Sequence, residues 1–405
     1  MTDRDRPYLR VALLGSTGSI GRQAVEVLAG DARFQVVGLS AGRNTALLGD
    51  QVRRLRPAVA VIAADADRDG VGELPAGTVV GVGDEALEAL AARPDLDLLI
   101  VGTGGVVSLR PVLAALRAGT PVATANKETL VAGGHLVMPL AEGLARARAA
   151  LDPADPLGST LGWIRPIDSE HSAIWQCLAG EDRASVAGLI LTASGGPFLD
   201  LPAEALANVT ADQALRHPTW AMGPKITVDS ATLANKGLEV IEARWLYDVP
   251  YDMIDVVIHR QSVVHSAVRF IDGSVKAQLG TPDMRLPIQY ALTYPNRRPS
   301  LAAAPNLVEV GRLDFEAPDV TRFPALRIAR EAGGIGPWAT AALISADDVA
   351  VTRFLAGTLD FAGIPRLLGS AIERHGLRTG PQPDVDDLVA LDAEIRAMYS
   401  AGSIA

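Results

Sequence analysis

A short glycine-rich turn near the start of the chain restricts the fold more than any other stretch. The apolar run Val11 to Leu14 predicts a strand, and the segment from Gly15 to Gly21 follows it with the spacing G-x-x-G-x-x-G. A helical pattern then continues through Leu28. Strand, glycine turn and helix together are typical of a dinucleotide-binding fold, because the glycines let the backbone approach a pyrophosphate whose charge the helix N-terminus favours. The alternative is an ordinary turn between a strand and a helix.

The second predicted strand, Phe34 to Leu39, indicates which nucleotide the fold binds. An NAD site usually has an acidic residue about 20 residues after the first glycines. No Asp or Glu lies between residues 32 and 49, whereas Arg43 is available to meet a 2′-phosphate. We therefore expect NADP(H) rather than NAD(H).

Strands and helices continue to alternate as far as residue 150. This alternation predicts an open, mostly parallel sheet, with ligand contacts at the carboxyl ends of its strands. The residues 102–105 and 126–128 fall at such ends. Further strands are predicted at Val59–Ile62, Val79–Val82, Leu98–Val101 and Val122–Thr124, and helices at Glu85–Ala92, Leu109–Ala118 and His135–Ala150.

Composition limits the class of protein. A chain of 405 residues predicts two or three domains. A formal net charge of -10 without a strongly basic stretch argues against nucleic acid as a partner. Cys177 is the only cysteine, which excludes an internal disulfide and fits a reducing compartment. The start, Met1 to Arg10, has no pattern of a targeting peptide, and no apolar run is long enough to span a membrane, so we expect a cytoplasmic protein.

Lysine is rare in this chain. Only four of the 37 cationic residues are lysine, namely Lys127, Lys225, Lys236 and Lys276. Because arginine serves as the general surface cation, a lysine here is expected where a compact ammonium is needed, for phosphate binding or for titration. Codon bias is the alternative.

The stretch from Pro166 to His171 places two carboxylates between a predicted strand, residues 161–167, and a predicted helix, residues 172–178. If this junction is extended, Asp168 and Glu170 project to one side, and such a pair of oxygen donors suits Mg²⁺ or Mn²⁺. The alternative is a helix start that Asp168 or Ser169 caps.

Two further stretches predict contacts with a ligand. Ser194 and the two glycines after it end the predicted strand Val186–Thr192 and can offer a hydroxyl group and backbone amides to an anion. The segment 217–224 carries Trp220 between turn-forming residues and suits a lid, or else an ordinary loop with the indole in the core.

The segment 225–239 predicts a short strand, a cap and then a helix. Ser230, Asn235 and Lys236 form a set suited to phosphate, and Glu239 offers a third carboxylate. A plain ion pair between Lys236 and Glu239 is the alternative. Beyond this helix we expect a smaller sheet, with strands at 254–259, 263–270 and 274–279, and then helices from 323 to 400.

Seven motifs, in order along most of the chain, resemble those of the 1-deoxy-D-xylulose 5-phosphate reductoisomerase family. They are Gly-Ser-Thr-Gly-Ser-Ile-Gly at 15–21, Ala-Asn-Lys-Glu at 125–128, Asp-Ser-Glu-His-Ser-Ala-Ile at 168–174, Ser-Gly-Gly-Pro-Phe at 194–198, Val-Asp-Ser-Ala-Thr at 228–232, Asn-Lys-Gly-Leu-Glu at 235–239 and Gly-Thr-Pro-Asp-Met-Arg at 280–285. The resemblance implies an enzyme that rearranges 1-deoxy-D-xylulose 5-phosphate and reduces it to 2-C-methyl-D-erythritol 4-phosphate, an isoprenoid precursor. It implies NADPH and Mg²⁺ or Mn²⁺ as cofactors, with Co²⁺ as a further option.

The resemblance also implies residue roles. Metal ligands would be Asp168, Glu170 and Glu239, and catalytic residues Lys127, Glu170 and His217. Substrate contacts would be Lys127, Ser169, Glu170, Ser194, His217, Trp220, Ser230, Asn235, Lys236 and Glu239. Cofactor contacts would be Thr17, Gly18, Ser19, Ile20, Gly42, Arg43, Asn44, Asn126, Glu128 and Gly223.

The expected fold class is α/β, with a Rossmann-like NADPH-binding domain at 1–150 and an α+β catalytic and metal-binding domain with a lid at 151–290. A linker at 291–320 and a helical C-terminal domain at 321–405 follow, and the family implies a homodimer. Four departures from the family pattern stand out, and none removes a proposed ligand. They are an insertion at 151–162, Arg260 in place of Pro, Pro224 in place of a basic residue and Asp347-Asp348 in place of Asn-Glu.

Two other functions compete with this interpretation. A simple NADP-dependent dehydrogenase without rearrangement has no use for three carboxylates, and one of the aspartate-semialdehyde type needs a nucleophilic cysteine, whereas Cys177 falls inside a predicted helix. A catalytically inactive NADP-binding sensor has no use for a metal set and a lid. Metal-dependent consumption of NADPH distinguishes the three.

Overall fold

The computed structural model describes residues 8–400, and its packing divides them into two compact units. The first unit contains the residues up to 126 together with 136–172 and 283–302. The second contains residues 127–135, 173–282 and those from 303 onward. The expectation that residues 1–10 carry no targeting peptide falls mostly outside the described residues. No helix within residues 8–400 is long and apolar enough to cross a membrane.

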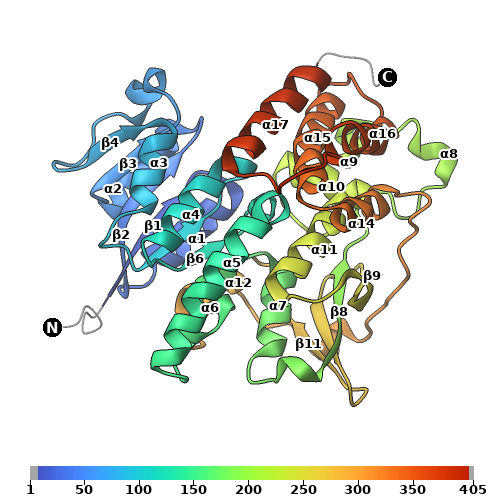
Figure 1. Ribbon diagram of the computed structural model, residues 1–405, viewed down its shortest axis with the longest axis horizontal. Helices are drawn as coiled ribbons and strands as arrows, with labels where there is room; N and C mark the ends of the chain where they lie inside the picture. Colours follow the sequence, from blue (N-terminus) through green and yellow to red (C-terminus); the bar gives the residue numbers. More distant parts are fainter. Residues whose placement is uncertain (1–7, 401–405) are drawn as a thin grey trace. The chain divides into compact units, whose positions relative to one another are not determined.

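The first unit is built on a seven-stranded parallel sheet in the order β4-β3-β2-β1-β5-β6-β7 (Figure 1). The strands are β1 Leu9–Leu14, β2 Phe34–Ala41, β3 Val59–Ile62, β4 Val79–Val82, β5 Leu98–Val101, β6 Val122–Thr124 and β7 Ile164–Pro166. Residues 11–13 and 99–101 are completely buried, as expected for strands covered on both faces. The strand order reverses between β1 and β5, so the dinucleotide crevice of such a sheet lies at their carboxyl ends. The predicted parallel sheet is confirmed.

The helices of this unit connect these strands or, as α12 does, pack on a connecting helix. They are α1 Ser19–Ala29, α2 Thr45–Leu55, α3 Gly83–Ala91, α4 Leu109–Arg117, α6 Thr160–Trp163 and α12 Arg285–Thr293, with 3₁₀ turns at Asp65–Val71, Val106–Ser108 and Pro156–Gly158. In α1 the buried residues include Gly21, Ala24, Val25 and Leu28, which form one apolar face at helical spacing. Two helices, α5 Lys127–Leu151 and α7 Ser169–Leu178, contribute residues to both units.

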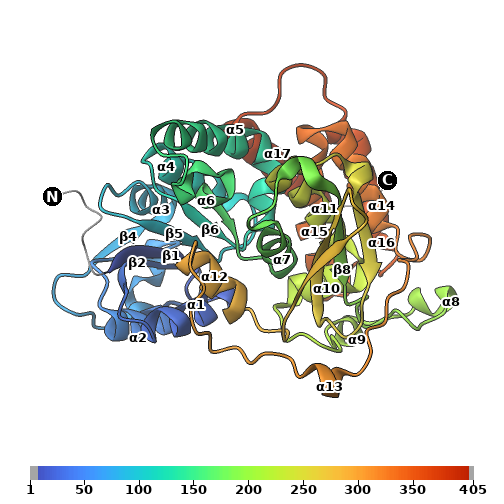
Figure 2. The ribbon, with the colours of Figure 1, turned by 90° about the horizontal axis from the view of Figure 1, so that it is seen from below.

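The second unit combines a smaller mixed sheet with a helical layer (Figure 2). The sheet has the order β11-β10-β8-β9, with β8 parallel to β9 and antiparallel to β10. Its strands are β8 Val186–Ala193, β9 Ile254–Ile258, β10 Val264–Phe270 and β11 Val275–Leu279. Its helices are α8 Ala203–Leu206, α9 Ala211–Ala214, α10 Pro224–Thr232, α11 Ala234–Tyr247, α13 Leu307–Val310, α14 Ala325–Ile335, α15 Pro337–Leu355, α16 Gly363–Ala371 and α17 Val385–Tyr399. Short helical turns lie at Arg183–Ser185, Tyr251–Met253 and Ile372–Gly376. The predicted smaller sheet and C-terminal helices are confirmed.

Helix α11 is the central element of the second unit. It contacts β8 and β9 on one side and α14 on the other, and α14 in turn packs against α15. The contact with α14 is close at Gly237, where an added Cβ would lie 2.5 Å from the Cβ of Ala329. The predicted close backbone approach at this glycine is confirmed.

Two predicted strands are wrong. Of residues 161–167 only β7 is extended, because its partner β6 has three residues, and the preceding turn is helix α6, whose Trp163 indole donates to the Leu157 carbonyl at 2.8 Å. The strand predicted after Lys225 is instead helix α10. Pro224 occupies its first turn, and the Thr227 hydroxyl donates to the Gly223 carbonyl at 2.7 Å.

The two compact units are discontinuous in sequence, whereas the predicted domains are continuous. Strand β7 extends the first sheet beyond residue 150, and α12 packs on α1 although it follows the smaller sheet in the chain. The predicted domain boundaries themselves stay a prediction.

Candidate active site

The glycine turn after β1 has a backbone that requires glycine. Gly15 has a φ of 76°, and a Cβ there would lie 2.9 Å from the carbonyl carbon of Gly102, which follows β5. A Cβ on Gly21 would lie 2.1 Å from the Gly15 carbonyl oxygen. The turn is also tied to β2, because the Gly15 amide donates to the Ser40 hydroxyl at 3.0 Å. The crevice between β1 and β5 is therefore narrow and built from backbone, as a pyrophosphate site requires.

The predicted cofactor residues of the first unit gather at the carboxyl ends of its strands. Thr17 to Ile20 form the turn and the start of α1, and Gly42 to Asn44 follow β2. Arg43 is exposed there, with no acidic residue between it and residue 49. Asn126 follows β6 and is buried, and its amide donates to the Gly105 carbonyl at 2.8 Å. The other two lie in the second unit, where Glu128 is in the first turn of α5 and Gly223 is the N-cap of α10.

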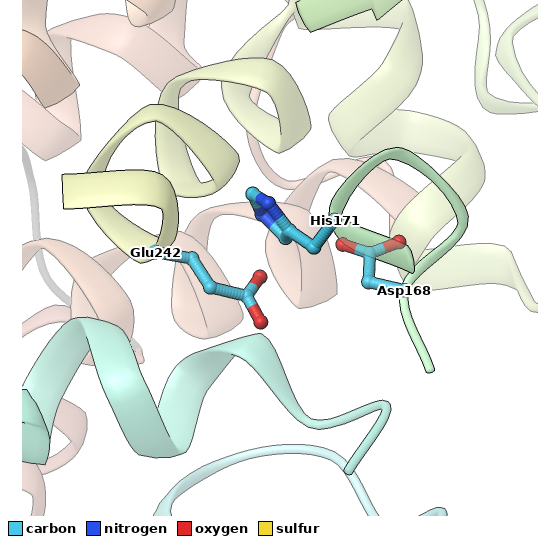
Figure 3. Close-up of side chains that lie close together, drawn as sticks. All are labelled: Asp168, His171 and Glu242. Atoms are coloured by element: carbon cyan, nitrogen blue, oxygen red, sulfur yellow. The ribbon is translucent and has the colours of Figure 1, made fainter. Parts of the chain in front are cut away.

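The acidic junction after β7 is helical and not extended. Asp168 immediately precedes α7, whose first turn contains Ser169 and Glu170, and the Ser169 hydroxyl donates to a Glu170 carboxylate oxygen at 2.5 Å. Figure 3 shows Asp168 and His171 on the chain that enters α7. The prediction that an extended backbone aligns the two carboxylates is wrong. Asp168, just before the helix, and Glu170, in its first turn, still place two oxygen donors close to the positive end of the helix dipole.

A buried carboxylate with two lysines lies on α11. Glu239 accepts from Lys127 at 3.2 Å and from Lys236 at 2.5 Å, and from the Asn235 amide at 2.5 Å. Glu239 is 0% exposed, Lys236 3% and Lys127 5%. The ion pair of Lys236 with Glu239, which was the alternative interpretation, therefore exists, and Lys127 joins it as a second ammonium group. Figure 3 shows a second buried glutamate of the same helix, Glu242.

A neutral hydrogen-bonded group joins Ser194 after β8, His217 before α10 and Ser230 near the end of α10. His217 Nε2 lies 2.8 Å from the Ser194 hydroxyl and 3.2 Å from the Ser230 hydroxyl. His217 Nδ1 accepts the backbone N–H groups of Thr219 and Trp220, at 3.1 and 2.9 Å. Since Nδ1 is an acceptor, the ring proton is on Nε2 and points to the two serines. The structure brings together these three residues of the predicted substrate set.

The imidazole of His217 is held in its neutral form. Burial lowers the pKa of His217 below its ordinary value, and the two amides that donate to Nδ1 also oppose protonation. The same two bonds fix the backbone of residues 215–223, which has no regular structure and carries Trp220 with its ring edge against His265. His217 therefore serves as a hydrogen-bond donor near neutral pH, and lid movement of this segment stays a prediction.

Sequence reasoning missed one ionic group, in which a half-buried lysine binds two buried carboxylates. The Lys225 ammonium binds Asp229 at 2.7 Å and Asp347 at 2.6 Å. Lys225 and Asp229 are four residues apart, so a helical interpretation of this stretch would have found the pair. Of the four lysines only Lys276 forms an ordinary surface ion pair, with Glu181. The expectation that lysines mark special positions holds for the other three, which all lie in the second unit.

Comparison with known proteins places the chain in one family. Three family models match, described as 1-deoxy-D-xylulose 5-phosphate reductoisomerase at residues 11–134, its C-terminal domain at 164–247 and the DXP reductoisomerase C-terminal domain at 279–398. A curated relative of that name from Pelotomaculum thermopropionicum is 49% identical and covers 96% of this chain and 97% of its own.

Solved structures agree over the whole chain. The reductoisomerase from Zymomonas mobilis in complex with NADPH has a TM-score of 0.83 at 35% identity, covering 97% of this chain and 98% of its own. A DOX-P reductoisomerase in complex with NADPH, fosmidomycin and magnesium has a TM-score of 0.87 at 33% identity, with the same coverage. Together with the parallel sheet, the glycine turn and the buried lysine–glutamate cluster, these matches show that the chain belongs to the 1-deoxy-D-xylulose 5-phosphate reductoisomerase family.

Proposed function

We propose that the chain catalyses the NADPH- and divalent-metal-dependent conversion of 1-deoxy-D-xylulose 5-phosphate to 2-C-methyl-D-erythritol 4-phosphate in isoprenoid precursor biosynthesis. The observation that carries this proposal is the cluster of Glu239 with Lys127 and Lys236, because a simple dehydrogenase has no use for a buried carboxylate between two ammonium groups. Solved relatives that are titled as complexes with NADPH and with magnesium support the two cofactors.

We assign the metal to Asp168, Glu170 and Glu239. Their donors are all carboxylate oxygens, which suit Mg²⁺ or Mn²⁺ and also accept Co²⁺. When bound to these residues, the ion would supply Lewis acidity at this end of the substrate. Ser169, which donates to Glu170, orients one ligand and touches the same end of the substrate.

The phosphate end is assigned to four side chains that offer hydroxyl, amide or ammonium donors, and to a neutral histidine. His217 Nε2 donates its proton toward the hydroxyl groups of both serines. The four side chains are Ser194, Ser230, Asn235 and Lys236. Lys127 binds both Asn235, which is assigned to the phosphate, and Glu239, which is assigned to the metal. Its ammonium group therefore lies between these two residues. We assign it to hold and protonate the oxygens of the rearranging carbon chain. Trp220 covers the substrate and excludes water.

Two variants of His217 separate its two nitrogens. In His217→Asn the side-chain oxygen can replace Nδ1 as acceptor for residues 219 and 220, but the donor to the serines is lost. His217→Gln keeps a donor near Nε2 and loses that acceptor. We expect His217→Asn to raise KM for the substrate about tenfold or more with an unchanged Tm, since a hydrogen bond to a charged group contributes roughly 1.5–3 kcal/mol. His217→Gln should lower Tm more than it raises KM, and the opposite pattern would contradict the tautomer.

The pH dependence of stability tests the neutral state of His217. The folded pKa of His217 lies below its ordinary value, so the folded protein binds fewer protons than the unfolded chain below about pH 6.5. This contribution to stability is present above pH 6.5 and is lost as the pH falls. We expect the Tm of the wild type to fall from pH 7 to pH 5 by more than the Tm of His217→Asn. Equal slopes would show that the imidazole is not held neutral.

Arg43 is assigned to the 2′-phosphate of NADPH. It is exposed after β2, where a charge-assisted bond to a phosphate is available and no acid competes. Arg43→Asp should lower kcat/KM for NADPH by about tenfold or more and change kcat/KM for NADH much less. The measurement is the ratio of kcat/KM for the two cofactors, and equal losses for both would contradict the assignment.

An assay decides between the three candidate functions. The purified chain should oxidise NADPH only with both 1-deoxy-D-xylulose 5-phosphate and a divalent metal, and NMR should identify a branched product. Reduction without carbon rearrangement would favour a dehydrogenase, and cofactor binding without turnover would favour a sensor.

We further propose that the protein is a cytoplasmic homodimer that binds neither nucleic acid nor a membrane. The edge strand β11, with Val275 exposed, supports a dimer contact, which light scattering tests.

A further inference from the structure

Two buried carboxylates share a single lysine between helices α10 and α15. The Lys225 ammonium lies 2.7 Å from Asp229 Oδ2 and 2.6 Å from Asp347 Oδ2. Asp229 is 3% exposed and Asp347 0%. Because both oxygens flank the same nitrogen atom, the two carboxylates are neighbours. One positive charge thus faces two groups that are ordinarily negative.

The second oxygen atom of each carboxylate, Oδ1, does not contact Lys225 and lacks a donor among the described residues. Asp229 Oδ1 and Asp347 Oδ1 are both buried, and neither has a hydrogen-bond partner among the described residues. A buried acceptor without a donor is costly, and two such atoms in neighbouring groups are rare. A single retained proton turns one of these acceptors into a donor, for which the neighbouring carboxylate is an available acceptor.

The surrounding charges favour retention of that proton. Glu128 of α5 and Asp348 of α15 add negative charge near Lys225, and Asp348 lies 3.6 Å from its nitrogen. Among the cations, Lys127 lies beside Glu128, and Arg396 of α17 binds Asp348 and Asp392 at 2.7 Å each. Burial and the charge of Asp347 raise the pKa of Asp229 well above its ordinary value, and burial raises the pKa of Glu128. With the pair itself included, five carboxyl groups of the described residues lie among three cations, which are Lys225, Lys127 and Arg396.

We propose that Asp229 and Asp347 share one proton, and that this pair, held on Lys225, fixes α10 against α15 and so positions Ser230 for substrate binding. Helix α10 packs on α15, and Ser230 is the residue after Asp229. Gly223 at the start of α10 also ends the segment that carries His217 and Trp220. The pair is a positioning device, since neither carboxylate is assigned to touch the substrate. The effect on KM rests on the proposed function, whereas the effect on stability does not.

The sign of the pH dependence follows from the retained proton. An unfolded aspartate releases its proton near pH 4, whereas the pair keeps one proton at higher pH. The folded state therefore binds more protons, and its stability falls as the pH rises from about 4 toward the folded pKa of the pair. Loss of the proton leaves two negative groups on one ammonium, which should loosen α10 from α15 and raise KM for the phosphorylated substrate.

Asp347→Asn tests the proposal, because the amide supplies a permanent donor in place of the proton. We expect its Tm to exceed that of the wild type by more at pH 9 than at pH 6. The ratio of KM at pH 9 to KM at pH 6 should fall at least twofold below the wild-type ratio. Asp348→Asn is the matched control on the same helix. It removes a partner of Arg396 and one nearby negative charge but supplies no donor to the pair, so its Tm should gain less on the wild type between pH 6 and pH 9 than the Tm of Asp347→Asn does.

The outcome that overturns the proposal is equally definite. If Asp347→Asn changes Tm relative to the wild type by the same amount at pH 6 and pH 9, the two carboxylates share no proton. The same conclusion follows if the Tm of the variant falls further below that of the wild type at pH 9 than at pH 6. If this variant fails to fold, Asp229→Asn is judged by the same criterion, because either member can carry the amide. Failure of both variants to fold would show that both charges are required, which also overturns the shared proton. The Tm comparison needs no activity, so it distinguishes this proposal from the proposed function.

Discussion

Glu239→Gln should abolish metal-dependent turnover and leave NADPH binding intact. Glu239 is the fully buried carboxylate of α11 and is assigned as one of three metal ligands. Loss of a residue that only orients a metal ligand typically costs about 10–100-fold. Loss of the ligand itself should therefore lower kcat/KM by more than about a hundredfold. The measurement is kcat/KM over a Mg²⁺ titration, with NADPH affinity measured separately by fluorescence.

The same change also removes the partner of two buried ammonium groups. Lys127 and Lys236 would keep their charge beside a neutral amide, and breaking a buried ion pair typically costs about 3–5 kcal/mol. We therefore expect a lower Tm as well, and the activity must be measured below the new Tm.

Double variants test whether the carboxylates act as one site. Glu239→Gln combined with Asp168→Asn should cost about as much as Glu239→Gln alone, because ligands of one ion are not additive. If the losses of kcat/KM in the two single variants multiply in the double variant, Glu239 serves only as an ion-pair partner. Near-normal metal dependence of Glu239→Gln alone would lead to the same conclusion.

Gly21→Ala should disrupt the cofactor site and lower stability together. The added Cβ would lie 2.1 Å from the Gly15 carbonyl oxygen and 2.6 Å from the backbone of Ser16. Backbone atoms cannot rotate away as a side chain can, so the turn between β1 and α1 must open. Overpacking of this kind costs about 1–3 kcal/mol or more. We expect NADPH affinity to fall at least about tenfold, measured by titration, with a clear drop in Tm.

Gly18→Ala is the control for this variant. Its added Cβ would lie 3.4 Å from the nearest atom, the Gly15 carbonyl oxygen, and Gly18 has a φ of -71° that any residue adopts. Its Tm should stay close to that of the wild type. If Gly21→Ala bound NADPH as tightly as the wild type, the turn would not be the pyrophosphate site.

The sequence predicted the first sheet well because its strands are short apolar runs between polar loops. Strands β3, β4, β5 and β6 have the predicted bounds, and the glycine turn defined where the sheet reverses. Helix α10 was missed because Ile226, Thr227 and Val228 favour a strand by local propensity. Pro224 and the contact with α15 overrode that preference.

Contacts distant in sequence were the part that could not be predicted. Lys127 and Glu239 were each expected in the site, but their bond joins residues 112 positions apart. Asp347 was noted only as a departure from the family pattern, and its bond to Lys225 spans 122 positions. Local patterns give the type of each element, whereas such pairings depend on how helices pack.

The close packing at Gly237 has a consequence for inhibitors. Lys236 and Glu239 lie one on either side of this glycine, within about one helical turn. Since α14 touches the backbone there, the turn cannot unwind or shift to suit a ligand of another length. The distance between an anion-binding lysine and a metal-binding carboxylate is thus a fixed property of the enzyme. Resistance to an inhibitor that spans the two groups would have to arise in the loops around α11, because a larger residue at 237 would separate α11 from α14.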